Sequence, residues 1–318
     1  MYYIGIDLGG TIIKTALVKE GRIIDIARMA SDSGHGLSAR LIPLADCIND
    51  LIQRSGTATS DIGGINIAFP GIVNVRQKKV LATNAKYDDA PDVDLNTWAH
   101  DNWNLPLVID NDARMATVGE WHYGAGMGLK NMVMMTIGTG IGTGVIIDGR
   151  LLYGPNYCAG SLGGHLIVDY RGRRCTCGNV GCAEAHGSSF FLPDIIRECA
   201  TLSESFKDHA GEATFEALCE KVRIGDKEAA LVLRECMDVW CAAIVNYVHA
   251  YDPERIVIGG GIMKSADLIL PYLREKVNNL AWRPWGNVEI EASLLGDHAA
   301  MVAADIYFSN HKMEEYVS

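Results

Sequence analysis

The chain has no long uninterrupted run of apolar residues. Hydrophobic residues make up 48% of its 318 residues, but no stretch reaches the ~18 apolar residues typical of a membrane-spanning helix. The most apolar segment, residues 131–148, is interrupted repeatedly by glycine and threonine. The first residues lack the basic segment and the cleavage site of a signal peptide. We therefore expect neither a membrane span nor a secretory leader.

Positive charge is also scarce. The 28 Lys and Arg residues are outnumbered by 39 Asp and Glu residues, and the formal net charge is −11. This balance argues against a nucleic acid bound through its backbone phosphates. It does not exclude a nucleotide, because a phosphate site needs only local donors such as backbone N–H groups. At 318 residues the chain is long enough for two lobes.

A disulfide framework is missing as well. Nine cysteines are an odd number, and six of them are scattered without a regular pattern: Cys47, Cys158, Cys199, Cys219, Cys236 and Cys241. Unpaired thiols of this kind fit a reducing compartment. We therefore expect a cytoplasmic protein.

Apolar strands alternate with helical segments along the chain, which predicts an α/β protein. The expected strands are residues 2–7, 14–18, 23–28, 62–69, 107–109, 131–137, 143–147 and 255–258. The expected helices are residues 37–55 and 113–123, much of 188–251, and one that begins near Ser265. The order of strand, glycine–threonine turn, strand and tight turn occurs at the start of the chain and again from Asn131. This repetition predicts two lobes with one phosphate loop each and a boundary near Ala113.

The first glycine loop offers a candidate phosphate site made of Asp7, Gly9, Gly10, Thr11 and Lys14. Glycines let backbone N–H groups turn toward an anion, and an acid at a strand end can hold a hydrated Mg²⁺. Taken alone, this segment is more simply interpreted as an ordinary structural turn.

The second glycine loop spans residues 136–144 and has glycine at every second position from Gly138. Glycine weakens a strand, but it lets the main chain approach a ligand closely. Candidate phosphate contacts here are Gly138, Thr139 and Gly140. A third loop, of Gly259, Gly260 and Gly261, lies at the end of a strand, where an α/β fold often binds a nucleotide. It lacks the spacing of a dinucleotide-binding motif, and a purely structural role stays open for each loop.

Asn111 and Asp112 lie between a predicted strand and a predicted helix. An aspartate in this place can cap the helix, and without further context that is the simpler interpretation. Phosphoryl transfer to an alcohol needs a base that accepts the proton of the attacking hydroxyl. Asp112 is the best-placed carboxylate for this role.

A cluster of metal-binding side chains follows in the second half of the chain. Three thiols, those of Cys175, Cys177 and Cys182, lie within eight residues, and His165 precedes them. Three sulfurs and one nitrogen complete a tetrahedral zinc site and leave no position for a reactive water. We therefore expect a structural zinc ion. A zinc hydrolase or deaminase is excluded by this ligand count.

Together these segments resemble the ROK family of sugar kinases, within the actin-like ATPase (ribonuclease H-like) superfamily. The resemblance covers nearly the whole chain and includes Pro70-Gly71, Asn84, Asn111-Asp112, Glu184 and residues 295–299 besides the loops above. The order of zinc ligands is specific, whereas the glycine loops are shared across the superfamily. Some family members are repressors with an N-terminal helix-turn-helix domain. Because this chain begins at the phosphate-loop strand, we expect a kinase.

The resemblance implies an α/β, two-lobed actin-like ATPase fold with a structural zinc loop, and ATP and sugar in the cleft. The small lobe would be residues 1–112 plus 299–318, and the large lobe residues 113–298. Asp112 would be the base, and the C6 hydroxyl of a hexose the acceptor. Other sugar contacts would be Gly71, Asn84, Asn111, His165 and Glu184, with His165 also binding zinc. The implied cofactors are ATP, Mg²⁺ and Zn²⁺, and a homodimer is expected by analogy.

Two departures from the family pattern affect the expected substrate. Leu162 stands where the family usually has a glutamate that accepts hydrogen bonds near C1 and C2 of the sugar. Loss of that acceptor would leave a hydroxyl unsatisfied, at a cost of about 1–3 kcal/mol. A sugar modified at C1 or C2 is therefore a reasonable hypothesis. Residues 86–89 replace a short turn, and either reshape the sugar pocket or form a solvated loop.

Three functions are consistent with these observations. An ATP-dependent sugar kinase explains the base and both phosphate loops. A catalytically inactive sugar-binding or regulatory protein would explain the missing glutamate. A plain ATPase of the same superfamily is disfavoured, because the zinc loop delivers His165 and Glu184 to a polar pocket.

Overall fold

The computed structural model describes residues 1–84 and 86–309, which form two compact units. Unit 1 consists of Met1–Gly128, Gly149–Ser161 and Asp297–Ser318. Unit 2 consists of Leu129–Asp148 and Leu162–Gly296. The boundary expected near Ala113 falls inside unit 1, so the helix that follows Asn111 is part of this unit.

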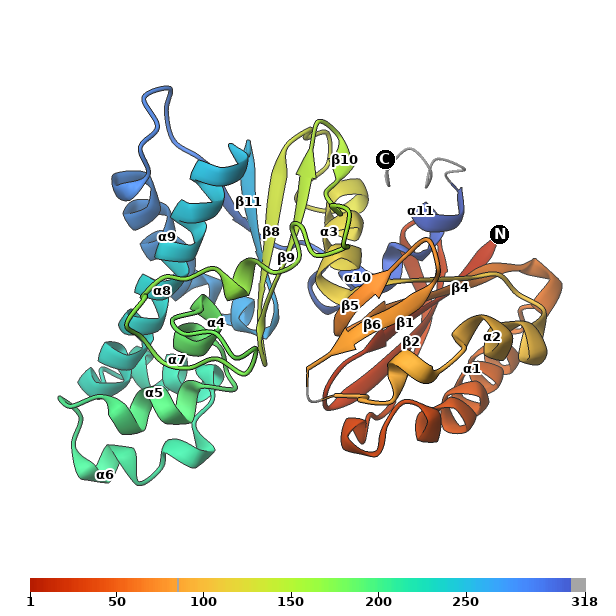
Figure 1. The fold of residues 1–318 in the computed structure, drawn as a ribbon, viewed down its shortest axis with the longest axis horizontal. Helices are drawn as coiled ribbons and strands as arrows, with labels where there is room; N and C mark the ends of the chain where they lie inside the picture. Colours follow the sequence, from red (N-terminus) through yellow and green to blue (C-terminus); the bar gives the residue numbers. More distant parts are fainter. Residues whose placement is uncertain (85, 310–318) are drawn as a thin grey trace. The chain divides into compact units, whose positions relative to one another are not determined.

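Unit 1 is built on a five-stranded sheet of order β3-β2-β1-β4-β7 (Figure 1). Its strands are β1 (Tyr2–Leu8), β2 (Ile12–Lys19), β3 (Arg22–Ala30), β4 (Ile62–Phe69) and β7 (Leu107–Asn111). The first three strands pair antiparallel, whereas β1, β4 and β7 run parallel to one another. Parallel strands end at one edge of a sheet. Asp7, Gly71 and Asn111 are therefore brought to the same edge.

The helices of unit 1 are α1 (Leu41–Ser55), α2 (Leu95–Trp103), α3 (Asp112–Tyr123), α10 (Ala299–Val302) and α11 (Ala304–Ser309). In α1 the buried residues recur at helical spacing, and this apolar face contacts β2 and β3. Helix α10 contacts β1, β2 and α3, so the end of the chain packs on its beginning. Helices α10 and α11 are separated at Ala303, and Asn310 lies outside the described residues.

Unit 2 repeats the same plan. Its strands, in sheet order, are β9 (Ile141–Ile147), β8 (Met132–Ile137), β11 (Arg255–Gly259) and β12 (Glu289–Ala292). The two-residue strand β10 (Arg150–Leu151), which follows β9, lies in the Gly149–Ser161 segment of unit 1. Strands β8 and β9 form an antiparallel hairpin, while β8, β11 and β12 are parallel. The repeat of a hairpin that the sequence predicts is therefore present in the structure.

Helices make up most of the rest of unit 2. They are α4 (Ala183–Gly187), α5 (Leu192–Glu198), α6 (Glu204–Lys207), α7 (Phe215–Arg223), α8 (Lys227–Tyr251) and α9 (Ala266–Leu280). The long helix α8 contacts α4, α7 and α9 and carries the fully buried Trp240. In the described part of the chain, no helix is both long and apolar enough to cross a membrane.

Several short elements were not expected from the sequence. They are the hairpin β5 (Gly71–Asn74) and β6 (Lys79–Thr83), helix α2 and strand β12. Helix α1 begins at Leu41, after 3₁₀ turns, and not at Leu37. The 3₁₀ helices are Ser33–His35, Ser38–Arg40, Thr59–Asp61, Ala90–Asp92, Gly163–His165, Ala210–Glu212, Gly261–Ser265 and Gly296–His298.

Candidate functional site

Asp112 lies at the carboxyl edge of the unit 1 sheet, as the first residue of α3. It does not cap the helix, because Asn111 is the N-cap residue and its side chain accepts a hydrogen bond from Arg114 N at 3.2 Å. The Asn111 amide donates to Asp112 Oδ1 at 3.0 Å and to the Gly71 carbonyl at 3.1 Å. The Ala113 N–H also donates to Asp112 Oδ1, at 2.8 Å. Among the described residues, no donor reaches Oδ2, so one carboxylate oxygen is held and the other is available.

The surroundings of Asp112 make it a stronger base than an ordinary aspartate. Burial, followed by the negative charge of Asp7, raises the pKa of Asp112 from 3.8 to about 6, against the opposing effects of the Ala113 N–H and Lys86. Removing a carboxylate from water disfavours its charged form. A group with this pKa is mostly ionised at pH 7 and still accepts a proton more readily than a solvated carboxylate.

The first glycine loop lies beside this carboxylate. Lys14 Nζ is 3.5 Å from Asp7 and 3.3 Å from Asp297, so two acids balance its charge. Burial raises the pKa of Asp7, while Lys14 lowers it. An ideal Cβ on Gly9 would lie 2.5 Å from the Ile12 carbonyl oxygen, which explains glycine there. One carboxylate beside a phosphate loop fits Mg²⁺, which takes few protein ligands and keeps several waters.

Residues 86–89 are not a solvated loop. Tyr87 is fully buried, with φ of 54°, and its hydroxyl donates to the Gly9 carbonyl at 3.0 Å. Burial raises the pKa of this hydroxyl to about 12, so it stays a donor. Asp89 accepts hydrogen bonds from the backbone N–H groups of Leu37 (2.5 Å) and Ser38 (3.0 Å). The segment is therefore anchored on the first glycine loop and the 3₁₀ turns before α1.

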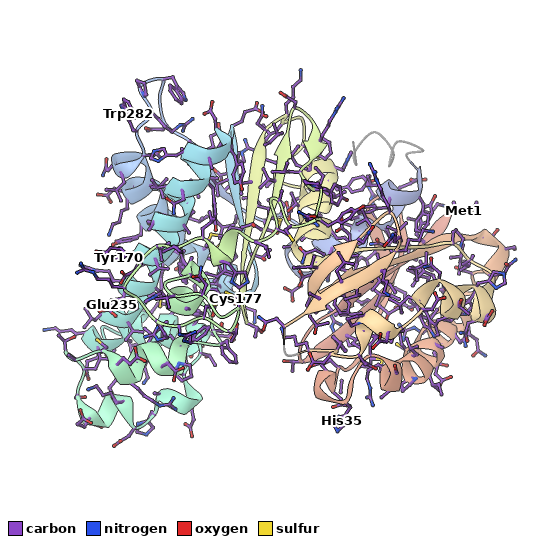
Figure 2. All side chains as sticks on the ribbon, in the orientation of Figure 1. Met1, His35, Tyr170, Cys177, Glu235 and Trp282 are labelled. Atoms are coloured by element: carbon purple, nitrogen blue, oxygen red, sulfur yellow. The ribbon has the colours of Figure 1, made fainter. Side chains whose placement is uncertain are left out.

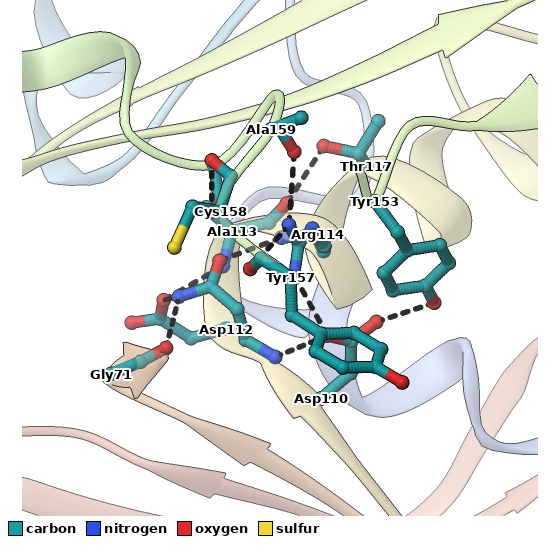
Figure 3. A network of polar contacts seen from close by, with 12 residues as sticks. Gly71, Asp110, Asp112, Ala113, Arg114, Thr117, Tyr153, Tyr157, Cys158 and Ala159 are labelled. Carbon is teal, nitrogen blue, oxygen red and sulfur yellow. Dashed lines mark hydrogen bonds and ion pairs between the residues drawn. The ribbon is translucent and has the colours of Figure 1, made fainter. Parts of the chain in front are cut away.

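A buried polar network surrounds Asp110, the next-to-last residue of β7 (Figure 3). Asp110 accepts hydrogen bonds from the hydroxyls of Tyr153 at 2.7 Å and Tyr307 at 3.1 Å, and it pairs with Arg114 at 3.5 Å. Arg114 also donates to the carbonyls of Tyr157 and Ala159, both at 2.9 Å. Burial raises the pKa of Asp110, while Arg114 and the hydroxyls lower it. The network fixes the backbone immediately before Asn111.

In unit 2, a cavity of about 170 Å³ lies beside the second glycine loop. Gly138 and Gly261, from the second and third glycine loops, both line it. The other lining residues are Ile137, Ser189, Thr214, Phe215, Glu216, Ile262, Lys264 and Ser265. An aromatic ring with hydroxyl and backbone groups around it suits the base and ribose of a nucleotide.

The three glycines at the end of β11 have different roles. Gly260 has φ of 90°, and a Cβ there would collide with the backbone of Ile137. A Cβ on Gly259 would lie 2.7 Å from the Met134 side chain. Gly261 has open space around it and lines the cavity. The loop therefore combines close packing of β8 and β11 with access to the cavity.

Glu184 joins the second glycine loop to the zinc-ligand loop. It is the second residue of α4, and its Oε2 accepts a hydrogen bond from the Ile141 N–H at 2.9 Å. A Cβ on Gly140 would collide with this carboxylate, which explains glycine there. Gly163, two residues before His165, donates its N–H to Thr143 Oγ1 of β9 at 2.9 Å. Both contacts tie the zinc-ligand loop to the glycine hairpin.

The predicted zinc ligands come together in space. The ligand atoms of His165, Cys175, Cys177 and Cys182 all lie within 4.8 Å of one another. His165 Nδ1 is 3.7 Å from Cys175 Sγ, and the sulfurs of Cys177 and Cys182 are also 3.7 Å apart. A tetrahedron with Zn–S bonds of about 2.3 Å has edges of about 3.8 Å. The cluster therefore fits a structural zinc ion; Cys177, labelled in Figure 2, is its exposed member.

Three candidate residues lie at the surface. Thr11 and Thr139 are exposed at the tips of their glycine loops, and exposed Asn84 follows β6. Leu162, at the expected position of a glutamate, is 38% exposed.

Sequence reasoning missed side chains whose partners are distant along the chain. These are Tyr153 and Tyr307, which bond to Asp110, and Phe215, which lines the unit 2 cavity.

The comparisons with known proteins agree with this architecture. The sequence profile of the ROK family matches residues 3–310. A glucokinase of Halalkalibacterium halodurans is 30% identical over 309 residues, which are 95% of this chain and 93% of that protein. A xylose repressor of Caldicellulosiruptor bescii is 28% identical over 316 residues, covering 95% of this chain and 78% of the repressor.

Solved structures place the fold. The ROK glucokinase of Streptomyces griseus, in complex with glucose and AMPPNP, superposes with a TM-score of 0.82 at 26% identity. The match covers 96% of this chain and 99% of that one. The expected actin-like ATPase fold is thereby confirmed.

We predict that Asp112 titrates near pH 6 in the folded protein, as burial and the charge of Asp7 raise its pKa to about 6. The ¹³C NMR shift of its carboxyl carbon, followed against pH and assigned with Asp112→Asn, measures this value. Replacing Asp7 by Asn removes a like charge and should lower the midpoint. A wild-type midpoint near 4 would contradict the described environment.

We also predict that Cys177→Ser loses bound zinc and thermal stability together, because no local group can replace the missing ligand. Metal analysis of the purified protein should give about one zinc per chain for the wild type. Cys199→Ser, which changes a thiol outside the cluster, serves as the control and should keep the metal. Zinc-free wild-type protein of full stability would remove the structural role.

Proposed function

Because this chain belongs to the ROK family, we propose that it transfers the γ-phosphoryl group of ATP to the C6 hydroxyl of a hexose, with Asp112 as general base. The chain is an ATP-dependent sugar kinase, as its glucokinase relatives and the ROK glucokinase structure support. The observation that carries the role of Asp112 is its one-sided hydrogen bonding: Asn111 and Ala113 hold Oδ1, and no described donor occupies Oδ2.

The chemistry follows from this geometry. Oδ2 of Asp112 accepts the proton of the sugar hydroxyl, and the sugar oxygen forms a bond to the γ-phosphorus. The bond between that phosphorus and the bridging oxygen of ADP breaks, which gives sugar phosphate and ADP. Asn111 keeps the carboxylate turned so that Oδ2 meets the hydroxyl. Mg²⁺, held through Asp7, would neutralise phosphate charge.

We assign the remaining residues by unit. In unit 1, the first glycine loop (Gly9, Gly10, Thr11 and Lys14) serves the phosphates. The sugar contacts of unit 1 are Gly71, Asn84 and Asn111. In unit 2, the cavity receives the adenosine, and the phosphate contacts come from Gly138, Thr139, Gly140, Gly259, Gly260 and Gly261.

The zinc-ligand loop presents two further sugar contacts, His165 and Glu184. His165 Nδ1 points to the thiol cluster, which leaves its other ring nitrogen for a hydroxyl. One oxygen of Glu184 is held by the Ile141 N–H, and the second can accept from the sugar. Zinc would act by fixing the loop and not by polarising the substrate, since four protein ligands fill its coordination.

Leu162 favours a substrate that lacks a free hydroxyl at C1 or C2, such as an anhydro-, deoxy- or acylamino-hexose. The leucine cannot accept the hydrogen bond that a glutamate would, so a hydroxyl facing it stays unsatisfied.

We further propose a cytoplasmic homodimer. The nine cysteines, all of them free thiols, support a reducing compartment.

The alternative is a catalytically inactive sugar-binding or regulatory protein of the same fold. The xylose repressors among its relatives and the missing glutamate favour it. The intact Asp112, with its raised pKa, favours the kinase. A coupled assay of ATP consumption separates the two. The hexose panel contains glucose, mannose, fructose, allose and C1- and C2-modified hexoses, and an inactive protein binds a sugar without turnover.

We predict that Asp112→Asn abolishes phosphorylation and spares ATP binding and folding. The amide cannot accept the hydroxyl proton, and general-base catalysis is commonly worth about 10²–10⁴-fold. Turnover is measured with the panel hexose that the wild type uses fastest, and ATP binding by calorimetry. Asp101→Asn, at an exposed position of α2, is the matched control and should keep wild-type turnover.

The same variant has a stability signature. The pKa of Asp112 is about 6 in the folded chain and 3.8 in the unfolded chain, so the folded state binds this proton more tightly. The proton therefore stabilises the fold at acid pH, and this stabilisation is lost as the pH rises through about 6. Asp112→Asn should therefore be at least as stable as the wild type at pH 7.5.

For the turnover prediction, an Asp112→Asn enzyme with near-normal turnover would remove this residue from the mechanism.

A further inference from the structure

Two lysines lie beside the first glycine loop, and their electrostatic settings differ. Lys14 is paired with Asp7 and Asp297, so its charge is already balanced within the protein. Lys86 forms no salt bridge with any carboxylate in the described part of the chain. The positive charge of Lys86 lowers the pKa of Asp112 and so stabilises its ionised form. Of the two, Lys86 is the lysine whose charge no carboxylate of the described residues balances.

Contacts with the loop define the position of Lys86. An ideal Cβ on Gly10 would lie 2.7 Å from Lys86 Cε and 3.0 Å from its Nζ, so the ammonium group passes directly over Gly10. Gly10 is one of the glycines whose backbone N–H groups would face a phosphate. The ammonium thus lies beside a phosphate loop and near enough to the proposed base to lower its pKa.

The neighbours of Lys86 restrain its backbone. Tyr87 is fully buried and bonded to the Gly9 carbonyl, and Asp89 accepts two backbone N–H groups before α1. These anchors hold the backbone that follows Lys86, which lowers the entropy that this segment would lose when a ligand binds.

We propose that Lys86 is a catalytic residue of this kinase, which binds the oxygens of the phosphoryl group while it is transferred; this inference rests on the proposed function. As the bond to ADP breaks and the bond to the sugar oxygen forms, negative charge spreads over three phosphoryl oxygens. The ammonium group of Lys86 stabilises that charge and exchanges no proton. The hydroxyl proton goes to Asp112. Tyr87 acts as a positioning residue through its bond to Gly9.

The kinetic test compares Lys86→Met and Lys86→Arg with Lys79→Met. Lys79 is an exposed lysine on β6 of the same unit and is the matched control. Removal of one transition-state donor commonly lowers kcat by about 10²–10³-fold, and we expect this range for Lys86→Met. The KM for the sugar should change much less than kcat. Lys86→Arg should restore part of the loss, because it keeps the charge.

Two measurements separate this role from a structural one. Binding of AMPPNP, which resembles the ground state, should be nearly unchanged in Lys86→Met. Binding of MgADP with aluminium fluoride, in the presence of the best panel hexose, should weaken by a factor close to the loss in kcat. In addition, the acid limb of kcat/KM against pH should move to higher pH, because Lys86 lowers the pKa of Asp112.

The outcomes are distinct. Lys86→Met turnover within about threefold of Lys79→Met, or equal weakening of AMPPNP and of the aluminium fluoride complex, overturns the role of Lys86 and leaves the kinase function standing. A wild-type protein that phosphorylates none of the hexoses overturns the proposed function, and this inference with it. An unfolded Lys86→Met protein makes Lys86→Gln the test variant, with the same criteria.

Discussion

The site depends on unequal hydrogen bonding at one carboxylate. Asn111 and Ala113 hold Oδ1 of Asp112, and the Asn111 amide is itself fixed by the Gly71 carbonyl. The second oxygen keeps its lone pairs for a ligand. Burial and the charge of Asp7 make this carboxylate hold a proton more tightly than a solvated aspartate. The proposed base therefore stands at the start of α3, where Asn111 is the N-cap residue.

The topology explains why these groups meet. Parallel strands β1, β4 and β7 end at one edge of the unit 1 sheet, and each end carries part of the site. Unit 2 repeats the hairpin and the parallel strand, and its glycine loop borders a cavity lined by Phe215. Glu184 accepts a hydrogen bond from Ile141 of that hairpin, which ties the zinc-ligand loop to the second glycine loop. The zinc site would thus stabilise the second glycine loop as well as the zinc-ligand loop.

Sequence reasoning located the structural features that are local in the chain. Glycine loops and the ligands from His165 to Cys182 are read from short spacings, and so is the strand–helix junction at Asp112. It could not resolve residues 86–89, because the partner of Tyr87 is Gly9, 78 positions away. The network behind Asp112 joins Asp110 to Tyr307, 197 positions away, and no periodic pattern marks such a pair. The hairpin β5–β6 and helix α2 were missed because short elements carry weak patterns.

If Asp112 is the general base, its Oδ2 faces the acceptor hydroxyl in the complex with both substrates. A crystal structure with AMPPNP, Mg²⁺ and the best hexose substrate tests it most directly. We expect a distance of about 2.6–3.0 Å between Oδ2 and the acceptor oxygen, with that oxygen aligned on the γ-phosphorus and Oδ1 still bonded to Asn111. A complex in which the acceptor hydroxyl lies beyond hydrogen-bond reach of Asp112, or meets another base, would contradict it.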